Sequence, residues 1–179
     1  FTGFLLALAT ANVGIALRYK LSVPWPVLGA IFAASMAANW FAFDLPRDSL
    51  VRMLAYQSPY AAMQVIGAMI VLRSRRWQAM DIGLFFVFTL SAMQFMSKPF
   101  VAQVTGGTGA SPQEYISTNY ALYSQSFGAV LSVAVGLLML MILVRDMLTD
   151  VTTRSETDPL SGLYNRRGTL ELLDSVLAE

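Results

Sequence analysis

Two residue types with reactive side chains are missing, because the 179 residues include no cysteine and no histidine. Without cysteine there is no disulfide framework, no thiolate metal site and no cysteine nucleophile. Without histidine there is no His-ligated haem, no His-rich zinc site and no Ser-His triad. We therefore expect no metal site and no cofactor in this chain.

Charged residues are scarce as well. They make up 13% of the chain, whereas hydrophobic residues make up 56%, and a soluble domain is about a quarter charged. This composition predicts a membrane protein whose main partner is the lipid bilayer. The net charge of +1 gives no indication of a nucleic-acid partner.

Five apolar segments approach the roughly 20 residues that a spanning helix needs. They predict an all-α fold, a polytopic transmembrane helical bundle. The third segment is the least regular, because Arg52 lies near one end and Pro59 predicts either a kink or a new helix start. The segments are Phe1–Leu17, Pro24–Phe43, Leu50–Leu72, Trp77–Met96 and Tyr120–Val144.

The loops between these segments differ in charge. By the positive-inside rule the loops rich in Lys and Arg are cytoplasmic, so Phe1 starts outside and Glu179 ends inside. Asp81 is then a carboxylate at a helix start near the cytoplasmic face. An outside start with five segments suggests a six-helix parent. The cytoplasmic set is Arg18, Lys20, Arg73, Arg75, Arg76 and Arg145, and the outer loops hold Asp44, Arg47, Asp48, Lys98 and Glu114.

The long outer loop, 97–119, contains a glycine-rich run from Thr105 to Pro112. A phosphate-binding P-loop needs Gly-Lys-Ser/Thr at the start of a helix. This run has no lysine and lies on the outer side, so we interpret it as a flexible loop.

Each apolar segment carries at least one amide side chain. Polar groups in hydrocarbon usually face the bundle interior. Their commonest use is to join helices by hydrogen bonds, and the alternative is a shared polar cluster that binds a small apolar or amphipathic ligand. The candidate ligand-binding residues are Asn12, Asn39, Gln64, Gln94 and Gln125.

The apolar positions keep a regular step beyond the fifth segment and into the polar stretch 145–157. Their spacing of 3, 4, 3, 4 is the a/d pattern of a coiled coil, although about two heptads also fit a helix end that frays into a linker. Small residues at Gly128, Ser132 and Gly136 form a candidate dimer face, or a face for packing within one protomer. The candidate stalk positions are Leu137, Leu140, Val144, Met147 and Val151.

The segment Asp158-Pro-Leu-Ser-Gly-Leu-Tyr-Asn-Arg-Arg167 follows this stalk. It resembles the D-x-L-[TS]-G-L-x-N-R-R opening of GGDEF domains, the family of bacterial diguanylate cyclases. The resemblance covers about the last twenty residues. The signalling-hinge positions that match are Asp158, Leu160, Gly162, Asn165, Arg166 and Arg167.

The resemblance implies a mechanical role for these residues. Asp158 is expected to pair with a motif arginine and to hold the turn between the stalk and the catalytic domain, while Pro159 ends the stalk helix. GGDEF domains work in pairs, so a homodimer through the fifth segment and the stalk is expected. The domain organisation is then 1–144 sensor bundle, 145–157 signalling stalk and 158–179 start of a truncated α/β GGDEF domain.

The family's catalytic residues are absent, because no Gly-Gly-Asp/Glu-Glu-Phe occurs in the chain. We expect this polypeptide to be part of a longer bacterial inner-membrane protein, with GTP and Mg²⁺ bound by the rest of the GGDEF domain. It alone is not expected to make cyclic di-GMP. The alternatives are a sensor for a degenerate GGDEF protein or a GGDEF-phosphodiesterase fusion, a small transporter subunit, and a membrane anchor without a ligand.

Overall fold

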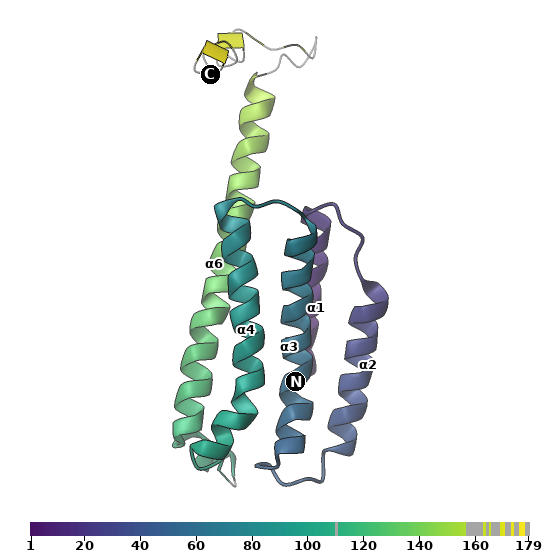
Figure 1. The fold of residues 1–179 in the computed structure, drawn as a ribbon, viewed down its shortest axis with the longest axis vertical. Helices are drawn as coiled ribbons and strands as arrows, with labels where there is room; N and C mark the ends of the chain where they lie inside the picture. Colours follow the sequence, from purple (N-terminus) through teal and green to yellow (C-terminus); the bar gives the residue numbers. More distant parts are fainter. Residues whose placement is uncertain are drawn as a thin grey trace. The chain divides into compact units, whose positions relative to one another are not determined.

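The computed structural model describes residues 1–109 and 111–156 and, beyond these, Leu163, Asn165, Thr169, Leu170, Leu173, Val176 and Leu177. The described part is all-helical and contains no strand, which confirms the predicted all-α class for these residues (Figure 1). The helices are α1 (Thr2–Arg18), α2 (Trp25–Phe41), α3 (Leu50–Arg73), α4 (Ala79–Val104), α5 (Pro112–Ile116) and α6 (Asn119–Glu156). Two units are distinguished, Phe1–Gly136 and Leu137–Glu179, and their boundary falls inside α6, before the predicted boundary at 144.

Helix α3 is the centre of the first unit, where it packs against α1, α2 and α4 (Figure 1). It stays a single helix through Pro59, so the second of the two alternatives, a new helix start at Pro59, is not found. Gly67 permits the close approach of its neighbours, because a Cβ atom at this position would lie 3.2 Å from Asn12 Oδ1 and 3.3 Å from the ring of Phe88.

Helix α4 is longer than the sequence indicated. The predicted end at Met96 is wrong, since the helix continues to Val104 and contains Pro99. Burial explains the extension, because Ala102 is fully buried in a cluster with Met53 and Tyr120. The first residues of the predicted outer loop are therefore helical.

Two helices in the described residues are long and apolar enough to cross a membrane, Ala79–Val104 and the stretch Asn119–Thr152 of α6. Helices α1 and α2 are also apolar but have only 17 residues each. Helix α3 has the length, but its arginines, glutamines and proline lower its hydropathy. The prediction of five spans stays a prediction for these three helices.

Candidate functional site

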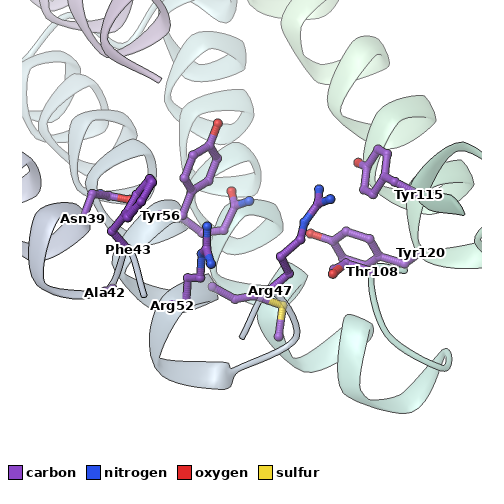
Figure 2. Close-up of a pocket in the computed structure, with 11 residues that line it drawn as sticks. Asn39, Ala42, Phe43, Arg47, Arg52, Tyr56, Thr108, Tyr115 and Tyr120 are labelled. Carbon is purple, nitrogen blue, oxygen red and sulfur yellow. The ribbon is translucent and has the colours of Figure 1, made fainter. Parts of the chain in front are cut away.

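A pocket of about 510 Å³ lies at the end of the first unit where the α2–α3 and α4–α5 loops meet (Figure 2). Six parts of the chain contribute to it: α2, the α2–α3 loop, α3, the α4–α5 loop, α5 and the first turn of α6. The volume is in the range of small-molecule sites. Its lining is Asn39, Ala42, Phe43, Arg47, Arg52, Met53, Tyr56, Gln57, Thr108, Tyr115 and Tyr120.

The lining carries two guanidinium groups and no carboxylate among the residues that the structure describes. Arg52 is half-buried, donates a hydrogen bond to the carbonyl of Leu45, and lies 6.0 Å from the ring centroid of Phe43. Arg47 is exposed and also lines an adjoining hollow of about 340 Å³ together with Asp48. The main pocket is therefore basic, and Arg52 is the cation more deeply placed in it.

Two polar atoms at the pocket are buried and have no hydrogen-bond partner in the protein, Gln57 Oε1 and Thr108 Oγ1. Thr108 is only 8% exposed. A buried polar atom without a partner costs free energy, so these groups mark the pocket as suited to a molecule that supplies hydrogen bonds.

The glycine-rich loop places Thr108 at the pocket. Gly107 and Gly109 have φ angles of 90° and 76°, which residues with a side chain rarely adopt. A Cβ atom on Gly109 would also lie 2.9 Å from the backbone nitrogen of Tyr115. The glycines thus allow the loop to fold back onto α5, where the rings of Tyr115 and Tyr120 meet at 6.0 Å.

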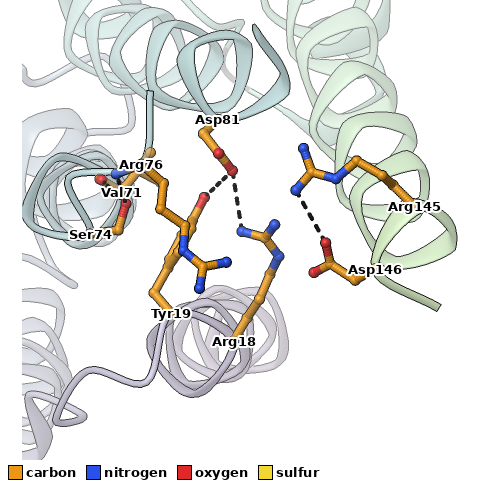
Figure 3. Close-up of polar contacts among 8 residues, drawn as sticks. All are labelled: Arg18, Tyr19, Val71, Ser74, Arg76, Asp81, Arg145 and Asp146. Carbon is orange, nitrogen blue, oxygen red and sulfur yellow. Dashed lines mark hydrogen bonds and ion pairs between the residues drawn. The ribbon is translucent and has the colours of Figure 1, made fainter. Parts of the chain in front are cut away.

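A second polar cluster lies at the opposite end of the first unit (Figure 3). Asp81, in the first turn of α4, is fully buried. Its Oδ1 accepts hydrogen bonds from the Tyr19 hydroxyl at 2.7 Å and from Arg18 at 3.2 Å. Burial is the main reason that the pKa of Tyr19 lies above its ordinary value, and the hydrogen bond to Asp81 acts in the same direction. The position at a helix start was predicted from the sequence, whereas the complete burial was not.

The predicted amide residues do not share one cavity. Three of them donate hydrogen bonds to a backbone carbonyl of another helix: Asn12 to Met63 at 3.0 Å, Asn39 to Ala55 at 3.1 Å, and Gln94 to Ser124 at 3.5 Å. These are the helix-joining bonds that polar groups commonly form in membrane proteins.

The remaining amides are placed differently. Gln64 is buried in α3, while Gln125 is exposed on α6. Of the five candidate ligand-binding residues only Asn39 lines the pocket.

The candidate stalk positions all lie on α6 and are exposed, by 46% to 64%. The candidate dimer face divides, because a Cβ atom on Gly128 would meet Gln94 and Lys98 of the same chain, whereas Gly136 has nothing within 4 Å. Of the hinge residues, Asn165 is described, and its carbonyl accepts from the Thr169 nitrogen at 2.9 Å. The predictions for Asp158, Leu160, Gly162, Arg166 and Arg167 lie outside the described residues.

Sequence reasoning missed most of the pocket. The sequence identified Arg47 only as a charge in an outer loop and Arg52 only as an irregularity in an apolar segment. The tyrosines of the pocket were not among the predicted candidates. The available signal was Arg52 itself, because an arginine within an apolar helical segment is by default a functional candidate. No protein-family model, curated protein or solved structure matches the chain.

Proposed function

We propose that this chain is the transmembrane sensory and regulatory region of a diguanylate cyclase, an enzyme that makes cyclic di-GMP from two GTP molecules. The observation that carries the proposal is the motif from Asp158 to Arg167, which begins two positions after the end of α6. In GGDEF proteins a helical stalk commonly enters the catalytic domain at this point. A signal received by the helices would reach the enzyme through that stalk.

The length of α6 supports this arrangement. Its 38 residues correspond to about 57 Å of helix, and the hydrocarbon core of a bilayer is about 30 Å thick. The stretch that is apolar enough to span, Asn119–Thr152, covers 34 of these 38 residues and therefore includes most of the proposed stalk. The helix is thus long enough to cross the membrane and to continue into the cytoplasm as the stalk.

The loop charges support an orientation with the carboxyl-terminal end in the cytoplasm of a bacterium, at the inner membrane. Arg18 and Lys20 follow α1, and Arg73, Arg75 and Arg76 follow α3. These basic loops are cytoplasmic by the positive-inside rule, which places the pocket of about 510 Å³ at the outer side. GTP is cytoplasmic, so this orientation suits a GGDEF domain beyond α6.

In the proposed arrangement all five long helices cross the membrane. Helix α3, which was not among the two apolar enough by composition, packs against α1, α2 and α4. Its Gln64 is buried and Arg52 and Gln57 are partly buried, so these polar side chains are directed at protein rather than at lipid, where they are tolerated.

The proposed mechanism uses a homodimer. The exposed a/d positions of the stalk, Met147 and Val151 among them, pair with those of a second copy. A shift of α6 then changes the register or rotation of the stalk, and the two catalytic domains align or separate. The residues that bind GTP and Mg²⁺ in this family are not in this chain, so no step of the GTP chemistry is assigned to its side chains.

The test uses the polypeptide that carries this region together with a complete GGDEF domain, purified in nanodiscs and incubated with GTP and Mg²⁺. Chromatography should show cyclic di-GMP. Asp158→Ala should alter turnover because the hinge is disturbed, whereas Asp174→Ala, outside the motif, should not.

A folded dimer that makes no cyclic di-GMP but hydrolyses it would contradict the synthase and favour the GGDEF-phosphodiesterase alternative. Binding of cyclic di-GMP without synthesis or hydrolysis would favour the degenerate receptor. Neither activity nor binding would favour a transporter subunit or a simple anchor.

A further inference from the structure

We infer that the pocket between α2, α3 and the α4–α5 loop binds a small aromatic carboxylate that carries a hydrogen-bond donor. The inference deepens the proposed sensory function and rests on it for the side from which the molecule arrives. Binding itself depends only on residues of the first unit.

The negative charge of the ligand follows from the cations. Arg47 and Arg52 are the charged residues of the lining, and a guanidinium group binds a carboxylate through two parallel hydrogen bonds. Arg52 directs one nitrogen to the carbonyl of Leu45, which fixes its head group at the pocket and leaves its other donors for a ligand. Asp48 lines the adjoining hollow and not this pocket.

The aromatic body follows from the other walls. The rings of Phe43, Tyr56, Tyr115 and Tyr120 surround the pocket (Figure 2). Aromatic rings prefer offset or edge-to-face partners, so a flat ring is a suitable occupant. A cavity of about 510 Å³ is large enough for a small ring compound.

The hydrogen-bond donor follows from the atoms without partners. Gln57 Oε1 accepts but cannot donate, and it is buried without a partner. Thr108 Oγ1 also lines the pocket without a partner, and its hydroxyl can either donate or accept. A phenolic or similar hydroxyl group on the ligand can donate to Gln57 Oε1, whereas a simple carboxylate can pair with Thr108 but leaves Gln57 Oε1 without a donor.

The pocket also reaches the helix that leads toward the stalk. Tyr120 is the second residue of α6 and is buried against Met53 of α3 and Ala102 of α4. A ligand in contact with Tyr120 therefore touches the start of α6 and the first half of α3 at the same time. This contact gives the bound molecule a physical route to change the position of α6.

The experiment measures binding of 4-hydroxybenzoate to the chain in phosphatidylcholine nanodiscs by isothermal titration calorimetry. The matched neutral probe is 4-hydroxybenzyl alcohol, and the probe without a donor is benzoate. We expect 4-hydroxybenzoate to bind more tightly than either. Equal affinity for the neutral probe, or no binding of 4-hydroxybenzoate, overturns the inference.

The variants locate the site. Arg52→Gln should weaken binding by about tenfold or more, since a hydrogen-bonded charge is lost. Arg47 is exposed, so Arg47→Gln tests the same point without disturbing packing. The matched control is Arg73→Gln, at the far, exposed end of the same helix. Unchanged affinity in both pocket variants, or an equal loss in the control, contradicts the assignment.

A second set of nanodiscs contains phosphatidylglycerol. If this anionic lipid abolishes binding in competition, the arginines serve a lipid head group and the inference fails. Cyclase turnover of the longer protein is measured separately with the same probe. Binding without a change in turnover supports the pocket and counts against the sensory function. A change in turnover without binding at the pocket counts against the pocket and supports the sensory function.

Discussion

Asn39 donates a hydrogen bond of 3.1 Å to the carbonyl of Ala55, the carbonyl that Pro59 cannot serve. In an α-helix this carbonyl would accept from the nitrogen of the residue four positions later, and a proline has no N–H to give. The Asn39 side chain on α2 thus supplies the hydrogen bond to the Ala55 carbonyl that Pro59 cannot supply within α3. This pairing explains why α3 continues through Pro59 and why Asn39 lies beside the pocket.

The pairing predicts a measurable coupling between Asn39 and Pro59. Asn39→Ala should destabilise the fold by about 1 kcal/mol, because the Ala55 carbonyl loses its partner. In a Pro59→Ala background the new N–H serves that carbonyl, so the same substitution should cost less. A double-mutant cycle of unfolding free energies in detergent measures the difference. Additive effects would show that Asn39 does not compensate for the proline.

The Tyr19–Asp81 pair predicts a pH dependence. The folded state holds the phenol proton more tightly than the unfolded chain, because the pKa of Tyr19 is raised by burial and by Asp81. The stabilisation is therefore complete below the ordinary tyrosine pKa of about 10 and is lost as the pH rises above it. Unfolding free energies measured on both sides of this pH should fall less steeply in Tyr19→Phe and in Asp81→Asn. Identical slopes in all three proteins would contradict the role of this pair.

The close approach of neighbouring helices at Gly67 predicts that a larger side chain at this position lowers the stability of the fold. Gly67→Leu should destabilise the fold by about 1–3 kcal/mol, because the new side chain meets Asn12 and Phe88. Gly29→Leu in α2 is the matched control, since nothing lies within 4 Å of a Cβ atom at that position. Thermal unfolding in detergent compares the two. A loss of stability as large in the control would point to a general effect of leucine.

The proposed dimer predicts cross-links along one line of the stalk. The chain has no cysteine, so a single introduced cysteine reports its own position. Met147→Cys and Val151→Cys should form disulfide-linked dimers in membranes because both occupy core positions of the heptad pattern. Thr149→Cys, on the outward side of the same pattern, should link much less. Equal linking at all three positions would contradict a defined coiled coil.

The sequence predicted the helices well and the pocket poorly, for physical reasons. Apolar length identified the five long helices, because hydropathy follows directly from residue type. The end of α4 was predicted too early, because Lys98 and Pro99 are typical of a loop. In the structure the helix continues, and Ala102 is buried by Met53 and Tyr120. That burial depends on residues distant in the chain, which a local pattern does not contain.

The pocket depends on distant residues even more strongly. Its lining includes Arg52, Thr108 and Tyr120, and Arg52 is separated from the other two by whole helices in the sequence. The amides were recognised because each interrupts an apolar run. Their partners are mostly backbone carbonyls, and a carbonyl carries no residue-specific signal in a sequence.

The helices of the first unit differ in length, and α1 and α2 are the shortest of the long ones. Of the two, α2 is bounded by described chain on both sides; it has 17 residues and is about 26 Å long, less than the hydrocarbon thickness of about 30 Å. In the proposed five-span arrangement this hydrophobic mismatch thins the bilayer beside α2, while the longer α6 tilts or extends beyond it. A thicker membrane then raises the free-energy cost of the mismatch beside α2. The protein would then respond to lipid chain length as well as to a soluble molecule.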